Sequence, residues 1–109
     1  NFENTVRAAM GFINLSTMQE DFDLRIDVNN GDIPAFSVYS KFGNLIFLSV
    51  QGNNRVDIFD AYRGQFLTSI EDVGDAPQGL TLSTGGDTLF VHNFLSRTIS
   101  AYNISAIVN

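Results

Sequence analysis

The feature that most constrains the fold of this chain is an internal repeat. Three segments recur farther along the sequence: 34–40 as 77–83, 44–49 as 88–93, and 54–60 as 97–103. The first and third pairs are 43 residues apart and the second pair is 44 apart, with the slips placed in turns, where insertions cost least. A period near 43 with several short strands is typical of a four-stranded propeller blade.

Each repeated unit is predicted to consist of short strands separated by turns that contain glycine. The expected strands are 35–40, 45–50, 55–59 and 65–70 in one unit, and 79–83, 88–93 and 97–102 in the next. The stretch 45–48 is apolar on both faces, as in a strand covered on both sides. In the third strand Val56 and Ile58 alternate with Asp57 and Phe59, which places the two pairs on opposite faces.

The predicted fold class is therefore all-β, with four-stranded antiparallel β-propeller blades, about two and a half blades of a larger ring. Residues 34–76 form one blade and 77–109 form a partial blade. Residues 1–33 form a partial, divergent blade with strands near 4–8, 11–15 and 23–28 and an insertion around 16–22. The one candidate for a helical turn is 16–20, where Ser16 and Gln19 have capping-box spacing.

Composition narrows the function classes. Twelve acidic against six basic residues give a net charge of −6, which argues against nucleic acid and anionic membrane surfaces as partners. The absence of cysteine excludes disulfides, thiolate catalysis and covalent c-type haem attachment within this chain. No apolar run is long enough to span a bilayer. Because the chain opens on Asn1 and soon enters strand-like sequence, we expect a fragment or a processed product.

The repeat residues resemble the YVTN-type β-propeller family of bacterial and archaeal secreted proteins. The residues that carry the resemblance are 75–83, 86–93 and 96–104. The chain departs from the family pattern at Thr84, where proline is usual, and at Asn103, where the other unit has Asp60. The match covers 34–105 well and 1–33 loosely.

The resemblance implies a ring of about seven blades and a periplasmic or extracellular location. It also implies an association with c-type cytochrome or dihaem peroxidase-like modules. Because no haem attachment motif occurs here, such chemistry would lie elsewhere in a parent protein or in a partner.

Four residues are candidates for a site on the rim of the ring. His92 is the only histidine, and it is either a metal or haem ligand or, as we favour, a packed or rim-facing side chain aligned with Leu48. Arg55 and Arg97 precede the third strand of each unit. They either bind an anion or, as we favour, form surface ion pairs, Asp57 and Asp87 being the nearby carboxylates.

Two acidic segments complete the candidates. Asp75 lies with two other carboxylates in the loop between units, 71–77, where solvated side chains are more common than acid–base pairs. The segment 20–32 is rich in carboxylates and invites a calcium site. Its glycine does not have EF-hand spacing, and the Asn30-Gly31 turn explains the sequence without metal. We therefore predict no catalytic, cofactor or metal site.

The sequence favours a non-catalytic propeller scaffold or binding module in a larger extracytoplasmic protein. Two alternatives remain: part of a periplasmic haem-linked redox enzyme, and a self-assembling structural subunit. Enzymatic activity stays open. The expected partners are other copies or other fragments of the same propeller, and a c-type cytochrome module under the first alternative.

Overall fold

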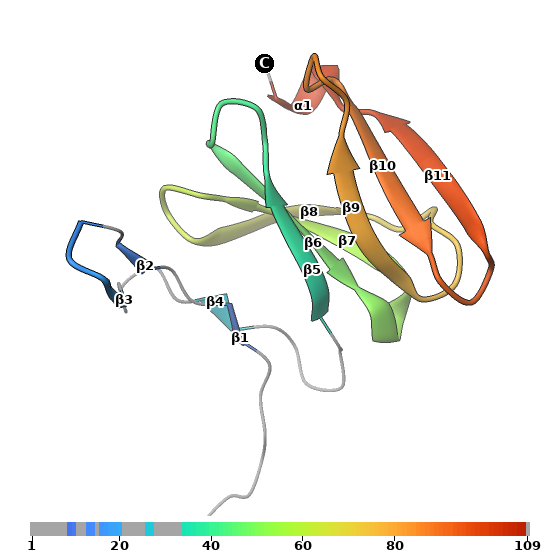
Figure 1. Ribbon diagram of the computed structural model, residues 1–109, viewed down its shortest axis with the longest axis horizontal. Coiled ribbons are helices and arrows are strands. Elements are labelled where there is room, and N and C mark those ends of the chain that lie inside the picture. Colours follow the sequence, from blue (N-terminus) through green and yellow to red (C-terminus); the bar gives the residue numbers. More distant parts are fainter. Residues whose placement is uncertain (1–8, 11–12, 15, 21–25, 28–33, 109) are drawn as a thin grey trace, which may run out of the picture.

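The computed structural model describes residues 9–10, 13–14, 16–20, 26–27 and 34–108, and within them the protein is built of antiparallel strands (Figure 1). The strands are β1 (Ala9–Met10), β2 (Ile13–Asn14), β3 (Gln19–Glu20), β4 (Ile26–Asp27), β5 (Pro34–Tyr39), β6 (Leu45–Val50), β7 (Arg55–Asp60), β8 (Gln65–Ile70), β9 (Pro77–Leu82), β10 (Thr88–Asn93) and β11 (Thr98–Asn103). A 3₁₀ turn, Gln51–Asn53, joins β6 to β7, and a four-residue helix, α1 (Ser105–Val108), follows β11. The all-β class is confirmed.

Two sheets contain most of these strands. One has four strands in the order β5-β6-β7-β8, and the other has three in the order β11-β10-β9. The seven strands expected between residues 35 and 102 all occur, each within two residues of its predicted ends. The strand predicted at 4–8 lies outside the described residues.

The one candidate for a helical turn, 16–20, does not form a helix. Residues 16–18 form the turn of a hairpin in which Asn14 of β2 pairs with Gln19 of β3. The outer strands of this region, β1 and β4, also pair antiparallel. The short helix α1 was not expected from the sequence. It follows a local turn in which the Asn103 side-chain oxygen accepts hydrogen bonds from the Ser105 amide and hydroxyl.

The two sheets repeat each other residue by residue at a separation of 43. Leu45 of β6 lies opposite Asp60 of β7, and Thr88 of β10 lies opposite Asn103 of β11 in the same way. The β5–β6 and β9–β10 ladders also correspond, including a register shift at the same place in each. The repeat is therefore a property of backbone pairing as well as of sequence.

The separation of 44 predicted for the second strand is wrong. It aligned apolar residues with apolar residues, but a shift of one residue exchanges the two faces of a strand. In the observed register His92 corresponds to Ser49, not to Leu48. Arg97 corresponds to Asn54, in agreement with the alignment of 54–60 with 97–103, so Arg55 and Arg97 are near each other in the repeat without being equivalent.

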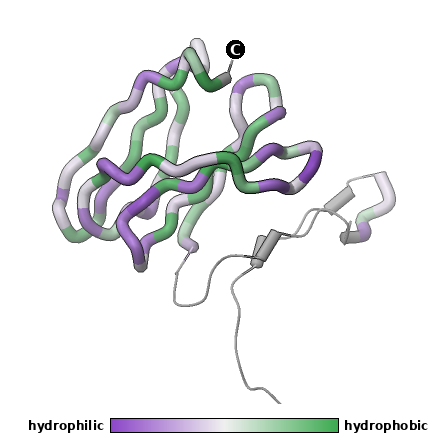
Figure 2. The backbone as a smooth tube through the Cα atoms, turned by 180° about the vertical axis from the view of Figure 1, so that it is seen from behind, coloured by the Kyte–Doolittle hydropathy of each residue, from purple (hydrophilic) through white to green (hydrophobic). Residues whose placement is uncertain are grey.

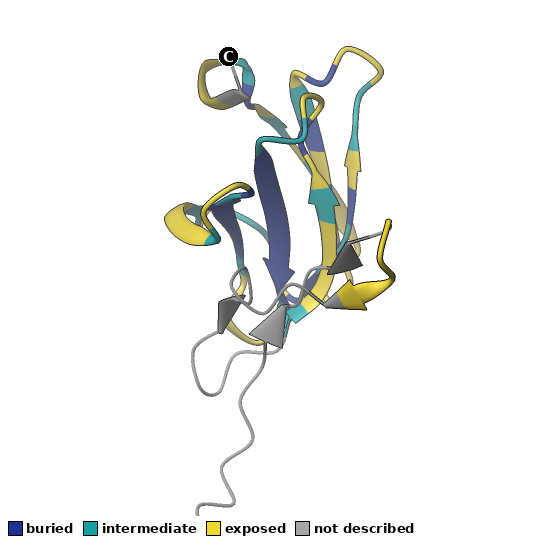
Figure 3. Ribbon diagram, turned by 90° about the vertical axis from the view of Figure 1, so that its left-hand side faces the viewer, coloured by how far each residue is buried: buried dark blue, intermediate teal, exposed yellow. Residues whose placement is uncertain are grey.

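Strand β6 is buried on both faces, as its apolar sequence predicted (Figure 3). Leu45 and Phe47 lie in the cluster that joins the two sheets, whereas Ile46, Leu48 and Val50 lie in a second cluster on the opposite face. β7 continues this division, with Val56 and Ile58 in the first cluster and Phe59 in the second. The predicted alternation in β7 is confirmed.

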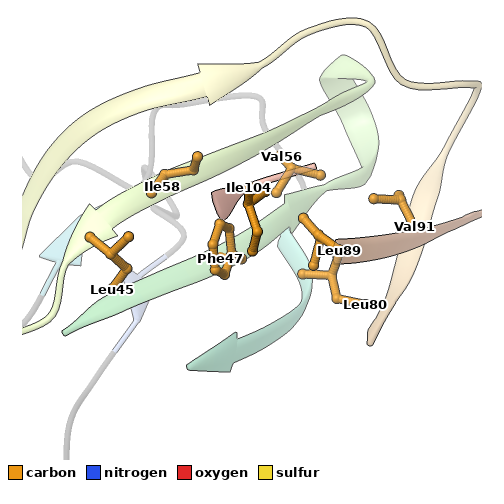
Figure 4. Packing of buried hydrophobic residues seen from close by; sticks show 8 residues of the cluster. All are labelled: Leu45, Phe47, Val56, Ile58, Leu80, Leu89, Val91 and Ile104. Atoms are coloured by element: carbon orange, nitrogen blue, oxygen red, sulfur yellow. The ribbon is translucent and has the colours of Figure 1, made fainter. Parts of the chain in front are cut away.

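The cluster between the sheets is the larger core. Its buried members come from β6 and β7 on one side and from β9, β10 and the residue before α1 on the other (Figure 4). They are Leu45, Phe47, Val56, Ile58, Leu80, Leu89, Val91 and Ile104. Full burial of side chains of this size contributes about 1.5–3 kcal/mol each, so sheet stacking is the main source of stability. Hydrophilic residues gather instead at the turns that join the strands (Figure 2).

The β5–β6 and β9–β10 turns are copies of one another and lie in contact. The amide of Gly43 donates to the Ser40 carbonyl and that of Gly86 to the Ser83 carbonyl, both at 2.9 Å. Both glycines have left-handed backbones, with φ of +74° and +79°. A Cβ at Gly86 would lie 2.6 Å from Cβ of Lys41 in the other turn, but a Cβ at Gly43 would meet nothing within 4 Å.

This difference gives a matched pair of variants. Gly43→Ala should lower the free energy of unfolding by about 1 kcal/mol, because a left-handed backbone disfavours a side chain. Gly86→Ala should lower it further, because Lys41 must also move. Urea unfolding of both variants measures the difference, and equal losses would contradict the contact between the turns.

Candidate functional site

All four candidate residues lie at one end of the two sheets. The antiparallel order brings the β6–β7 turn, the β10–β11 turn and the segment before β9 to the same end. Arg55 begins β7, His92 is next to last in β10, Arg97 lies in the following turn, and Asp75 lies just before β9. The structure nevertheless gives them different surroundings.

His92 and Arg97 line one open pocket of about 530 Å³ at the end of the second sheet. Its remaining lining residues are mostly apolar: Phe94, Leu95, Thr98 and Ile99. Leu95 and Ile99 are 69% and 70% exposed. Aliphatic side chains that are this exposed, and that lie beside the hydrogen-bond donors of His92 and Arg97, are typical of a contact surface.

Arg55 is an ion-pair residue, as favoured from the sequence, and it does not line this pocket. Its Nε lies 2.7 Å from Oδ1 of Asp57, and its Nη2 lies 3.3 Å from Oδ2. The Asp57 side chain is only 5% exposed and that of Arg55 17% exposed, so the pair is more buried than predicted. The two residues are two apart in β7 and share a face.

Arg97 adopts a backbone conformation that its side chain does not favour. Its φ is +57°, and the equivalent Asn54 has a φ of +52°. Asparagine tolerates this region better than other residues with a Cβ. The structure therefore holds this arginine, which lines the pocket, in a sterically costly backbone conformation.

Asp75 is exposed, but the backbone around it is held firmly. Its amide donates to Oγ of Ser96 at 2.6 Å, and its carbonyl accepts from the Leu95 amide at 3.2 Å. The next carbonyl, of Ala76, accepts from the Phe94 amide at 2.9 Å. The loop before β9 is thus pinned to the β10–β11 turn of its own sheet, with its carboxylate facing solvent.

A polar joint between the two sheets was missed by the sequence analysis. The hydroxyl of Ser49, fully buried in β6, lies 2.7 Å from the Gln78 carbonyl and 3.2 Å from the Phe36 carbonyl. The Gln78 side-chain amide donates to Oε1 of Gln51 at 3.2 Å, and the Ala76 amide donates to Oδ1 of Asn54 at 2.9 Å. The signal in the sequence was a lone serine inside an apolar strand.

This joint holds the start of β9. Ala76 and Gln78 flank Pro77, the first residue of β9, and each is bonded to the end of the preceding sheet. Ser49, Gln51 and Asn54 therefore fix where the second sheet begins along the first.

Among the residues that the structure describes, no group of three or more histidine, aspartate or glutamate side chains could hold a metal ion. Most of the acidic segment 20–32 lies outside those residues. No helix in the described part of the chain has the length and apolar character to cross a membrane. No known family model matches the sequence, and no curated protein matches it.

Ser49 and His92 occupy equivalent positions, but we expect their truncation to alanine to affect the free energy of unfolding differently. Ser49→Ala should lower the free energy of unfolding by about 1–2 kcal/mol, because the half-buried Gln78 carbonyl loses the hydroxyl of the fully buried Ser49 as its partner. His92→Ala, at an exposed position, should change it by less than about 0.5 kcal/mol. Chemical denaturation of the two variants checks this, and equal effects would show that the Ser49 hydrogen bond does not hold the sheets together.

Proposed function

We propose that this chain is part of a β-propeller that acts as a non-catalytic scaffold or binding module. The observation that carries the proposal is the repetition, at 43 residues, of the hydrogen-bond register of three successive strands in two stacked sheets. Units of this kind bury their faces only against neighbours, which is the principle of propellers and other repeat proteins.

The arrangement of the sheets agrees with this proposal. The first strand of the second sheet, β9, contacts both β5 and β6 of the first sheet. Corresponding strands therefore lie near each other, as the inner strands of successive blades do. The loop 71–76, which runs from β8 to β9, would be the crossing between blades.

The second sheet leaves one face uncovered. Phe47, Val56 and Ile58 of the first sheet are fully buried against the second. The residues 43 positions farther along are Phe90, Ile99 and Ala101, and all three are exposed. These three residues define the open face. Its exposed apolar side chains are evidence that a further unit of the same kind covers it.

In such an assembly, function would reside in the loops at the ends of the sheets and in other parts of the protein. The resemblance to YVTN-type propellers supports a periplasmic or extracellular location. The haem-linked alternative stays a prediction of that resemblance, and absorbance in the Soret region of the purified protein tests it.

The assembly predicts the native mass of the protein. Light scattering at micromolar concentration should give a mass above 12.0 kDa, with the denatured chains showing whether companions or copies supply the other units. Ile99→Glu should lower that mass, because it puts a charge on the open face. Tyr62→Glu is the matched control, since Tyr62 is 72% exposed in the β7–β8 turn. A monodisperse 12.0 kDa monomer would overturn the proposal.

A further inference from the structure

The pocket beside His92 has a counterpart at the end of the first sheet, where it is already filled. In the observed register His92 corresponds to Ser49, Phe94 to Gln51, and Arg97 to Asn54. Those three residues of the first sheet hold the segment 76–78 at the start of β9. The pocket of the second sheet is therefore built from the positions that receive a strand in the first.

We infer that this pocket is the seat for the first strand of a further repeat unit, an extended segment led by Gly-Asp-x-Pro. The inference rests on the proposed function, since it takes the open face to be covered by another unit. It adds the docking position and the chemistry that recognises the incoming chain.

The repeat itself defines the incoming segment. Gly-Asp-x-Pro leads into both units of this chain, at 31–34 and at 74–77, and its proline is the first residue of β5 and of β9. Proline at the head of the first strand fits an edge position, because it offers no amide hydrogen to a ladder. In the first sheet the residue before this proline, Ala76, is buried and donates its amide to Asn54.

Two polar residues of the pocket, His92 and Arg97, suit an acidic leading segment. An imidazole has an N–H donor in either protonation state, so His92 replaces the hydroxyl that Ser49 directs at the Gln78 carbonyl. The Arg97 side chain has hydrogen-bond donors and no acceptor, so it cannot accept a hydrogen bond from a backbone amide as Asn54 does. It fits the carboxylate or the carbonyl of the aspartate one residue earlier.

The apolar part of the pocket suits the body of the strand. Val56 is fully buried in the first sheet, whereas its counterpart Ile99 is 70% exposed beside the pocket. Covering an aliphatic side chain of this size contributes favourably to association. A strand of a further unit would use the apolar side chains along the open face and the two donors at its end together, which a small molecule in the pocket would not.

A labelled peptide with the sequence of residues 73–83 tests the inference against the full chain. Fluorescence anisotropy should show saturable binding below about 1 mM. Ile99→Glu in the chain should weaken binding at least about tenfold, whereas Tyr62→Glu, in the exposed β7–β8 turn of the first sheet, should leave it unchanged.

A double-mutant cycle tests the pairing of Arg97 with the aspartate. Arg97→Asn removes the charge and suits the left-handed backbone, so the fold is retained. Replacing the aspartate of the peptide by lysine should weaken binding to the unaltered chain about fivefold. The same change should have little effect on binding to Arg97→Asn.

Three results would overturn the inference: no saturable binding, binding equally strong for a scrambled peptide, or an aspartate effect that is the same in both chains. If the peptide does not bind but the native mass is above that of one chain, this docking position is wrong and the proposed assembly is still supported. Peptide binding by a monomeric chain would support the seat while the proposed assembly fails.

Discussion

The contact between the two sheets depends on strict alternation along each strand. Phe47 of β6 and Leu89 of β10 meet in one core because every second residue of their strands faces the other sheet. The same alternation gives β6 a second buried face through Ile46 and Leu48. A slip of one residue in a ladder would exchange the two faces of a strand, and β6 is apolar on both faces, so apolar contact alone does not fix its register.

Polar groups at the sheet ends supply that additional constraint. Apolar surfaces tolerate sliding because the hydrophobic effect has no direction. The bonds from Ser49 and Asn54 to the start of β9 have defined geometry, and a shift of one residue would break both. The turn contact between Lys41 and Gly86 fixes the opposite end. Stacking thus provides stability, and the ends of the sheets determine position.

Much of this fold could be predicted from the sequence, because strand length, glycine turns and alternation are local properties. The seven strands from β5 to β11 occur where they were expected, and the burial of β6 follows from its composition. The alignment of β6 with β10 failed because similarity of side chains cannot tell the two faces of a strand apart. Backbone pairing corrected it.

The candidate site was less predictable, because its character depends on contacts between sheets. The sequence favoured ion pairs for the arginines, and that holds for Arg55 with Asp57. It could not show that His92 and Arg97 share a pocket, since this follows from the turn after β10. The role of Ser49 depends on a carbonyl 29 residues away, which no local pattern reports.

The face of the first sheet that packs against the second sheet and the open face of the second sheet have the same alternation of side chains but are not interchangeable. The first sheet presents Ser49 and Ile58 to its neighbour, and the second presents His92 and Ala101 at the corresponding positions. Bulk is added at one position and removed at the other, so the shape of the face changes while its alternation is kept. A sheet that covers the second face therefore needs side chains of different size opposite these two positions from the sheet that covers the first. In the proposed assembly, differences of this kind would favour one order of units over others.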